Sequence, residues 1–151
     1  MSERWVKIWS TFFYIGYSPF APGSMASLAG AVLAVLLHQS TVLYVLVFVA
    51  ITAIGFKVGG AMEKITEKKD PGCVVIDEVS GIMIAFFLLP MTPAVIWTAY
   101  FLFRAFDMFK IYPVCKFEQL GGGLGIMMDD IIAGIYTGVI MHIAVRIVGI
   151  V

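Results

Sequence analysis

The sequence predicts an all-α fold: a polytopic membrane helical bundle with about five membrane-embedded helices and an amphipathic N-terminal segment. Hydrophobic residues make up 61% of the 151 residues, charged residues only 13%, and the mean hydropathy is +0.99. A soluble domain of this size would need more polar residues to cover its surface. Period-two alternation is absent, so membrane strands are disfavoured. We therefore expect a single membrane domain over residues 1–151.

The N-terminal segment MSERWVKIWS places Trp5 and Trp9 near Arg4 and Lys7. Aromatic and basic residues in this mixture are typical of a short amphipathic helix at the membrane interface. The segment lacks an apolar core followed by a small-residue cleavage site, so it does not resemble a signal peptide.

Apolar runs account for the five expected helices. They cover residues 25–37, 42–56, 79–89, 94–106 and 131–151. Several are shorter than the ~20 residues that span a bilayer, so the first and third should extend into neighbouring residues, tilt, or thin the bilayer locally. We expect the first helix to begin with Ser24 as its N-cap, the second to continue through EKITEKK, and the third to start near Val74.

Charged residues separate the connections into two kinds. HQST (38–41) and PMTP (90–93) contain none, whereas the N-terminal segment, Lys57–Glu78 and Arg104–Asp130 hold nine of the ten basic and all ten acidic residues. The charged segments should share one side of the membrane, which the concentration of Lys and Arg makes cytoplasmic. His38 and His142 should lie on the opposite side, and Arg146 is expected to snorkel to that interface.

Composition argues against a nucleic-acid partner and against a zinc site or disulfide scaffold. The formal net charge is zero, which argues against a nucleic-acid partner. Cys73 and Cys115 have neither zinc-ligand spacing nor the density of a disulfide scaffold, so both should be reduced thiols.

Seven charged residues interrupt or border apolar helices, where an ionisable group is costly unless it pairs or binds something. Arg104, Asp107 and Lys110 are spaced by three, so they follow one side of a helix, either as a salt-bridge ladder or as a phosphate-binding stripe. The acidic pairs Asp77–Glu78 and Asp129–Asp130 either complement helix N-termini or bind a metal. Carboxylate ligands in this number favour Mg²⁺.

Other polar residues are less specific. Glycines precede Asp129, and Gly122 and Gly123 there either present N–H groups to a phosphate or form only a flexible turn. Ser18 could donate to a ligand or simply to solvent or the backbone. The charged residues Glu3, Glu63, Lys64, Glu67, Lys68 and Lys69 should be solvated.

Four motifs in order, YSPFAPGSMASL, VVIDEVSG, FRAFDMFKIYP and LGGGLGIMMDDIIAGIY, resemble those of the phosphatidylglycerophosphatase A family over about residues 11 to 140. The resemblance implies a helical, Mg²⁺-dependent lipid phosphatase of the bacterial inner membrane. It would convert phosphatidylglycerophosphate to phosphatidylglycerol in phospholipid synthesis. The chain departs from the family pattern at Ile111–Tyr112, which separate Lys110 from Pro113, and at Met25–Ala26.

The resulting hypothesis gives each residue a role. Asp77, Glu78, Asp129 and Asp130 would organise one or two Mg²⁺ ions as metal ligands and catalytic residues, with Asp107 as a further ligand or base. Arg104 and Lys110, assisted by Ser18, Gly122 and Gly123, would bind the substrate phosphate on the cytoplasmic side. Whether water attacks directly or an aspartyl phosphate forms stays open.

Two alternatives belong to other classes. A small membrane transporter or ion channel would use intramembrane acidic residues as a permeation path. A non-catalytic, metal-binding scaffold would associate with other proteins through the small residues Gly55 and Gly59.

Overall fold

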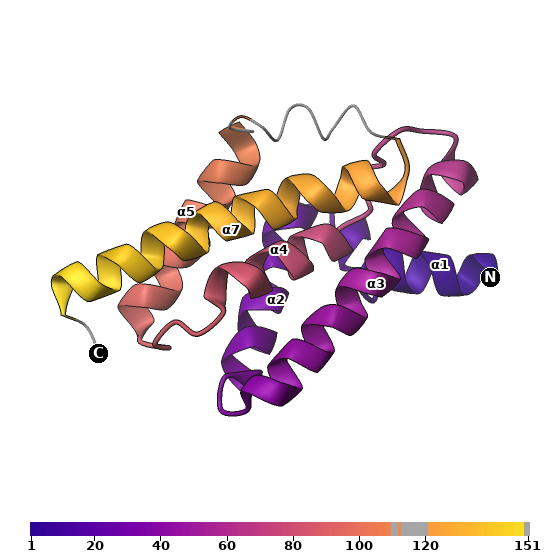
Figure 1. Ribbon diagram of the computed structural model, residues 1–151. Helices are drawn as coiled ribbons and strands as arrows, with labels where there is room; N and C mark the ends of the chain where they lie inside the picture. Colours follow the sequence, from indigo (N-terminus) through magenta and orange to yellow (C-terminus); the bar gives the residue numbers. More distant parts are fainter. Residues whose placement is uncertain (110–111, 113–120, 150–151) are drawn as a thin grey trace.

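The computed structural model describes residues 1–109, 112 and 121–149, and every regular element among them is helical. The elements are α1 (Glu3–Ser10), the 3₁₀ helix η1 (Ile15–Tyr17), α2 (Pro22–Leu37), α3 (Thr41–Thr66), α4 (Ile76–Phe86), α5 (Pro93–Phe109) and α7 (Gly123–Val148). In this described part of the chain no strand is present, which confirms the all-α prediction (Figure 1).

Helix α4 is the centre of the bundle. It packs against α2, α3, α5 and α7, most extensively against α7 (Figure 1). All of its residues except Glu78 and Ile84 are buried. The sequence explains this placement, because IDEVSGIMIAF offers small and β-branched residues on several faces and has no single polar side. The charged residues at the start of α4 are thereby held inside protein.

Glycines allow the neighbouring helices to approach α4 closely. A Cβ atom at Gly134 of α7 would overlap the carbonyl oxygen of Gly81, and one at Gly30 of α2 would lie 3.0 Å from Cα of Val79. Small residues of this kind let helix backbones come into contact. The spacing between α4 and its neighbours is therefore set by backbone contact.

Helices α3 and α7 are each long and apolar enough to cross a membrane. Each has 26 residues, and only 28% of its apolar 18-residue window is buried within the protein. At 1.5 Å per residue each is about 39 Å long, more than the ~30 Å of a bilayer core. Outward-facing residues such as Leu46 and Val139 are exposed and apolar. These two helices are consistent with a membrane protein.

The predicted count of about five membrane-embedded helices is not confirmed, because the described residues contain two candidate spans. Helix α4 has 11 residues, about 17 Å, and a helix of that length is more often a buried core helix. Its hydrophobicity is used for contact with other helices. Helices α2 and α5, with 16 and 17 residues, are also short for a perpendicular span.

Two predicted helix starts were wrong. Helix α2 begins at Pro22, so Ser24 lies inside its first turn and Ala21 is the N-cap residue; proline is well suited to the first helical position. Helix α7 begins at Gly123, so Asp129 and Asp130 lie in its second and third turns. Gly123 suits this start because it packs directly against the backbone of α3 at Phe56 and Gly60.

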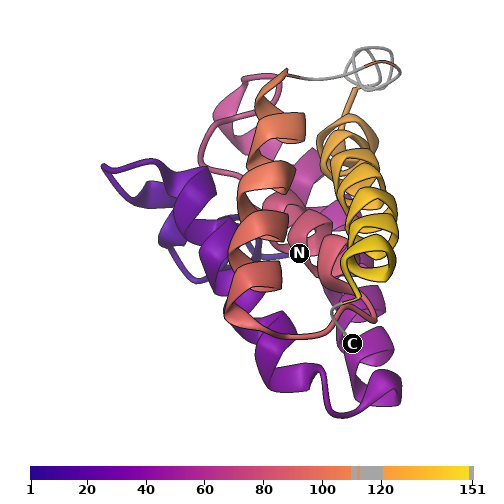
Figure 2. The same ribbon diagram turned by 90° about the vertical axis from the view of Figure 1, so that its left-hand side faces the viewer.

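The bundle has two chemically different ends. The uncharged α2–α3 and α4–α5 connections both lie in the lower half of Figure 2, and their residues His38 and Pro90 line one pocket with His142 of α7. We call this the uncharged end. The charged end contains the start of α4, the last turns of α5 and the first turns of α7. The predicted separation of His38 and His142 from the acidic residues is thus observed.

The N-terminal helix also forms as predicted. Helix α1 packs against α3, and Val6 is buried there while Trp5 is 57% exposed. A buried apolar face beside an exposed tryptophan is compatible with the amphipathic character expected of this segment.

Candidate active site

Three helices contribute charged side chains to a cluster at the charged end, and a fourth helix packs against it. Asp77 and Glu78 occupy the first turn of α4, and Arg104 and Asp107 lie near the end of α5. Asp129 and Asp130 come from α7, and the first turn of α2 lies against Glu78. We call Asp77, Glu78, Arg104, Asp107, Asp129 and Asp130 the carboxylate site. Residues more than fifty positions apart in sequence are thereby brought together.

Arg104 connects three of these helices. Its Nη1 atom lies 2.7 Å from Oδ2 of Asp107 and 3.5 Å from Oε1 of Glu78. The same nitrogen donates a hydrogen bond of 3.3 Å to Oγ of Ser27 in α2. The Arg104–Asp107 contact is the ion pair of the salt-bridge alternative, and Glu78 extends it to α4. The guanidinium is therefore held in place from several sides.

Three carboxylate oxygens in the site are buried without a hydrogen-bond partner in the described part of the chain: Oδ1 of Asp77, Oε2 of Glu78 and Oδ1 of Asp130. Asp77 is 8% exposed and Asp130 only 3%. A buried charge without a partner costs several kcal/mol or more. Such oxygens require a proton or a cation.

Repulsion among the acids strengthens this requirement. Asp130 interacts unfavourably with Asp77, Asp107, Asp129 and Glu78, and Asp77 with Glu78 and Asp129. Arg104 supplies one positive charge against these five carboxylates. In the folded protein as described, the site is therefore strongly acidic, and an additional cation would relieve both repulsion and missing partners.

The donor set fits a hard divalent cation, because carboxylate oxygens are the ligands that Mg²⁺ prefers. In residues 1–109, 112 and 121–149, no three Asp, Glu, His or Cys side chains already converge closely enough to hold one ion. The fit to a divalent cation therefore rests on the carboxylate oxygens that lack partners. It does not rest on a complete set of metal ligands among the described residues.

Glycine packing gives the carboxylates their positions. A Cβ atom at Gly23 would overlap the carboxylate of Glu78, so the start of α2 and this carboxylate are in direct contact. A Cβ at Gly81 would lie 2.6 Å from the carbonyl oxygen of Asp130. Absence of side chains at these two positions is what allows α2 and α7 to bring their residues against α4.

Asp129 is half-buried and contacts its own neighbour. Its Oδ1 accepts a hydrogen bond of 3.1 Å from the backbone N–H of Asp130. The adjacent acids therefore differ in environment, since Asp130 is directed into the bundle and Asp129 lies nearer its surface.

Of the predicted phosphate-binding residues that the structure describes, only Arg104 is part of the carboxylate site; the others make contacts elsewhere. Ser18 forms a local turn, accepting from the N–H of Phe20 and donating to its carbonyl. The N–H of Gly122 donates to Oε2 of Glu63 at 2.9 Å, and Gly123 packs on the carbonyl of Phe56 in α3. Lys110 lies outside the described residues.

Glu63 was expected to be merely solvated, and the structure corrects this. Its carboxylate accepts hydrogen bonds from the N–H groups of Asp70 and Gly122. It thereby ties the end of α3 to the start of α7. Sequence reasoning missed this role because Gly122 lies 59 positions away and EKITEKK reads as a solvated helix end.

Ser27 and Tyr100 are further residues that the sequence did not single out. Ser27 accepts from Arg104, and the hydroxyl of Tyr100 donates to the carbonyl of Ser24 at 3.0 Å. The available signal was the spacing of Ser24 and Ser27, one turn apart on α2, which places both toward the same neighbour.

Gly55 and Gly59 are used within the chain. A Cβ at Gly55 would overlap Met127, and one at Gly59 would lie 3.3 Å from Gly123. Both glycines therefore pack against α7, and the surface expected for association with another protein is internal.

Cys73 is a free, half-buried thiol. Burial raises its pKa, and Lys68 only partly opposes that effect. A nucleophilic cysteine needs a lowered pKa, so this thiol has the properties of an ordinary reduced residue. Cys115 lies outside the described residues.

Fold and site define a class: an all-helical protein with apolar helices and an acidic, arginine-containing site, the arrangement typical of proteins that act on phosphate esters. A model of the phosphatidylglycerophosphatase A family matches residues 8–145. The chain belongs to this family, and it is a phosphatase.

Relatives at moderate identity agree with this assignment. The phosphatidylglycerophosphatase A of Haemophilus influenzae is 38% identical over 130 residues, covering 80% of this chain and 77% of the relative. That of Escherichia coli is 35% identical over 146 residues, covering 94% and 84%. A putative phosphatidylinositol-3-phosphatase of Bacteroides thetaiotaomicron is 32% identical over 151 residues, covering 92% of each chain. No solved structure matches the chain.

Proposed function

We propose that the protein is a Mg²⁺-dependent phosphatase that hydrolyses the terminal phosphate of phosphatidylglycerophosphate at the carboxylate site. The observation that carries the proposal is the set of three buried, unpartnered carboxylate oxygens beside Arg104. The guanidinium of Arg104 can bind a doubly charged phosphate. The unpaired carboxylates beside it can bind a divalent metal. Family membership supports the substrate.

Asp77, Glu78, Asp129 and Asp130 are the residues that would hold Mg²⁺. When bound, the ion would act as a Lewis acid that polarises the phosphate and offsets its charge. The chain's contribution is to place these carboxylates at one end of the bundle and to shield Asp77 and Asp130 from bulk water. The close packing at Gly23 and Gly81 supports that arrangement.

Arg104 would bind the phosphate and offset the charge that develops on its oxygens in the transition state. Asp107 and Ser27 hold the guanidinium from two sides, so little reorganisation is needed when substrate arrives. Asp107 is in addition a candidate base or further ligand. Lys110, three residues along the chain, is proposed as the second cation for the phosphate.

The substrate's lipid character fits the candidate spans. Helices α3 and α7 would cross the bacterial inner membrane with the charged end in the cytoplasm, because nine of the ten basic residues belong to the charged segments. The carboxylate site would then meet a lipid phosphate at headgroup level. The transporter or channel alternative receives less support, since the acidic residues of the described chain that are buried all lie in the carboxylate site.

A second candidate substrate is phosphatidylinositol 3-phosphate, which the name of the Bacteroides relative suggests. Both lipids carry a phosphate monoester on the headgroup, so the carboxylate site suits either. Their ratio of kcat/KM decides between them. We expect phosphatidylglycerophosphate to be preferred, because the matching family model and two relatives of higher percentage identity are named for it.

The test is release of inorganic phosphate from each lipid in mixed micelles, with Mg²⁺ or with EDTA. We expect Mg²⁺-dependent release that falls about 10²-fold or more in Asp130→Asn. Glu67→Gln, at the exposed end of α3, is the matched control and should retain activity. Folded protein without release from either lipid, or activity unaffected by EDTA, would refute the proposal.

Acid quenching during turnover distinguishes the two forms of attack that the sequence leaves open. A phosphoryl group trapped on an aspartate of the protein assigns the attack to a carboxylate. Release of phosphate with no trapped species assigns it to water.

A further inference from the structure

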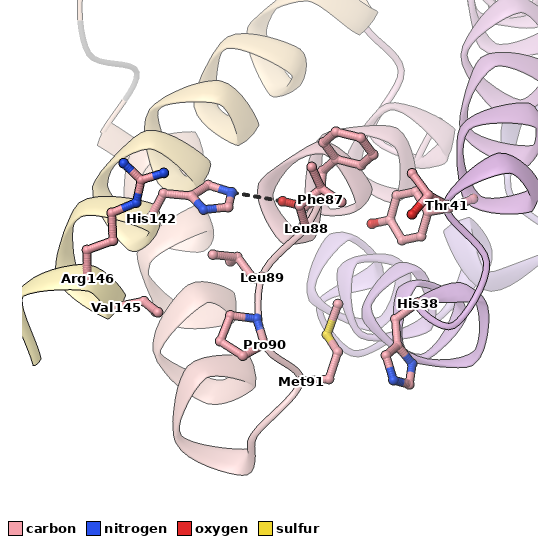
Figure 3. Close-up of a pocket in the computed structure, with 11 residues that line it drawn as sticks. His38, Thr41, Phe87, Leu88, Leu89, Pro90, Met91, His142, Val145 and Arg146 are labelled. Carbon is pink, nitrogen blue, oxygen red and sulfur yellow. Dashed lines mark hydrogen bonds between the residues drawn. The ribbon is translucent and has the colours of Figure 1, made fainter. Parts of the chain in front are cut away.

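A pocket of about 480 Å³ opens at the uncharged end, far from the carboxylate site along the bundle (Figure 3). It lies between the start of α3, the α4–α5 connection and the last turns of α7. His142 fixes one wall, because its Nε2 donates to the carbonyl of Phe87 at 2.9 Å. A volume in this range is usual for sites that hold small molecules or lipid headgroups.

Arg146 gives this pocket a positive charge. In Figure 3 its side chain stands beside His142, one turn away on α7. Within the described part of the chain Arg146 has no ion-pair partner, and no acidic residue lines the pocket. Thr41, the first residue of the 26-residue α3, adds the positive end of a helix dipole. Both features favour a negatively charged ligand.

The remaining lining is apolar. Leu88, which is 63% exposed, and Met91 contribute side chains, and Val145 lies beside Arg146 on α7. A small inorganic anion gains nothing from such walls, whereas a molecule with a charged head and a hydrocarbon body contacts both surfaces. The lining therefore favours an amphiphile.

The position of the pocket agrees with that chemistry. Thr41 begins one candidate span and Arg146 lies in the last turn of the other. If these helices cross a bilayer, both residues lie where the hydrocarbon ends and the phosphates begin. The carboxylate site, which includes residues near the opposite end of α7, would then face the other leaflet.

We propose that this pocket binds the headgroup phosphate of an anionic phospholipid from the leaflet opposite to the carboxylate site. Arg146 binds the phosphate, the start of α3 on the other side of the pocket adds positive potential, and Leu88 and Met91 contact the acyl region. The proposal does not depend on the identity of the substrate, because the bound lipid needs no terminal phosphate.

The test uses phosphatidylserine, a phosphodiester lipid without the monoester group that the proposed hydrolysis requires. Lipid retained by the purified full chain in neutral detergent is titrated by native mass spectrometry, with phosphatidylcholine for comparison. We expect retention of phosphatidylserine to be favoured, and Arg146→Gln to weaken it about tenfold. Arg4→Gln, an exposed arginine of α1, is the matched control and should retain the lipid.

Thr41→Asp supplies an independent variant. An acidic residue at the start of a helix is favourable for folding, yet here it places a negative charge in the pocket and should also weaken retention. Unchanged retention in both Arg146→Gln and Thr41→Asp would overturn the proposal. So would equal retention of phosphatidylcholine, or displacement of the lipid by millimolar inorganic phosphate, which would assign the pocket to a free anion.

Discussion

The carboxylate of Glu78 occupies the space that a side chain at Gly23 would need. Glu78 belongs to the buried helix α4 and Gly23 to the first turn of α2. The same carboxylate is 3.5 Å from Arg104 of α5. One glycine thus determines where a charged group of the site can lie.

Gly23→Ala is expected to reduce phosphatase activity about tenfold or more while leaving the fold largely intact. The new methyl group displaces the end of a flexible side chain rather than backbone, so the loss in stability should be below about 1.5 kcal/mol. Measured kcat and thermal unfolding in detergent separate the two effects. Gly72→Ala, where a Cβ would meet nothing within 4 Å, is the control. Full activity in Gly23→Ala would contradict the placement of Glu78.

Gly134→Ala should act on stability through the contact between α4 and α7. Its Cβ would overlap the carbonyl oxygen of Gly81, which is backbone and cannot rotate away. We expect a loss of about 1 to 3 kcal/mol, seen as a lower midpoint of thermal unfolding. Gly138→Ala, one turn further on, is the matched control because its nearest contact is an ordinary 3.5 Å. Equal midpoints for the two variants would show that this glycine contact does not limit the packing.

Asp130→Asn should inactivate the enzyme and yet stabilise the protein measured in EDTA. The substitution removes a carboxyl group whose ionised form is disfavoured by burial and by four neighbouring carboxylates, while keeping the size of the side chain. Mg²⁺ should raise the unfolding midpoint of the parent protein by binding the native state, and this increase should be lost in the variant. Glu3→Gln, at an exposed position of α1, should change neither value. A parent protein that Mg²⁺ does not stabilise would remove support for the metal ligands.

Arg104→Gln and Ser27→Ala test how the guanidinium is used. The arginine variant loses the contacts to Glu78 and Asp107 together with the proposed phosphate ligand, so kcat/KM should fall about 10²-fold or more. Ser27→Ala removes only one supporting hydrogen bond, worth about 1 kcal/mol, and should cost less than about tenfold. If the two variants lost activity equally, Arg104 would act mainly through its contact with α2.

Much of this organisation could be predicted from the sequence. The apolar runs and the absence of alternation indicated helices, and the charge-free connections indicated which helix ends lie together. The spacing of Arg104 and Asp107 allowed either an ion pair or a phosphate-binding stripe, and the ion pair is present. These features depend on local periodicity or on composition, both of which a single sequence displays.

The remaining features depend on contacts between distant residues. An apolar run such as IMIAF looks the same whether it faces lipid or protein, so α4 was counted as a span. The role of Glu63 required knowing that Gly122 lies beside it. The function of Gly23 likewise follows only from the approach of α2 to Glu78. Tertiary packing decided each of these cases.

The central position of α4 has a consequence for biosynthesis. Its main packing partner, α7, follows every other described helix in the chain, and α7 also brings Asp129 and Asp130. In a nascent chain that has emerged only as far as α5, Asp77 and Glu78 therefore lack the packing surface and the two aspartates that α7 supplies. Catalytic competence should appear only when the ribosome has synthesised α7 and this helix has docked, so hydrolysis begins after translation of the site's final helix.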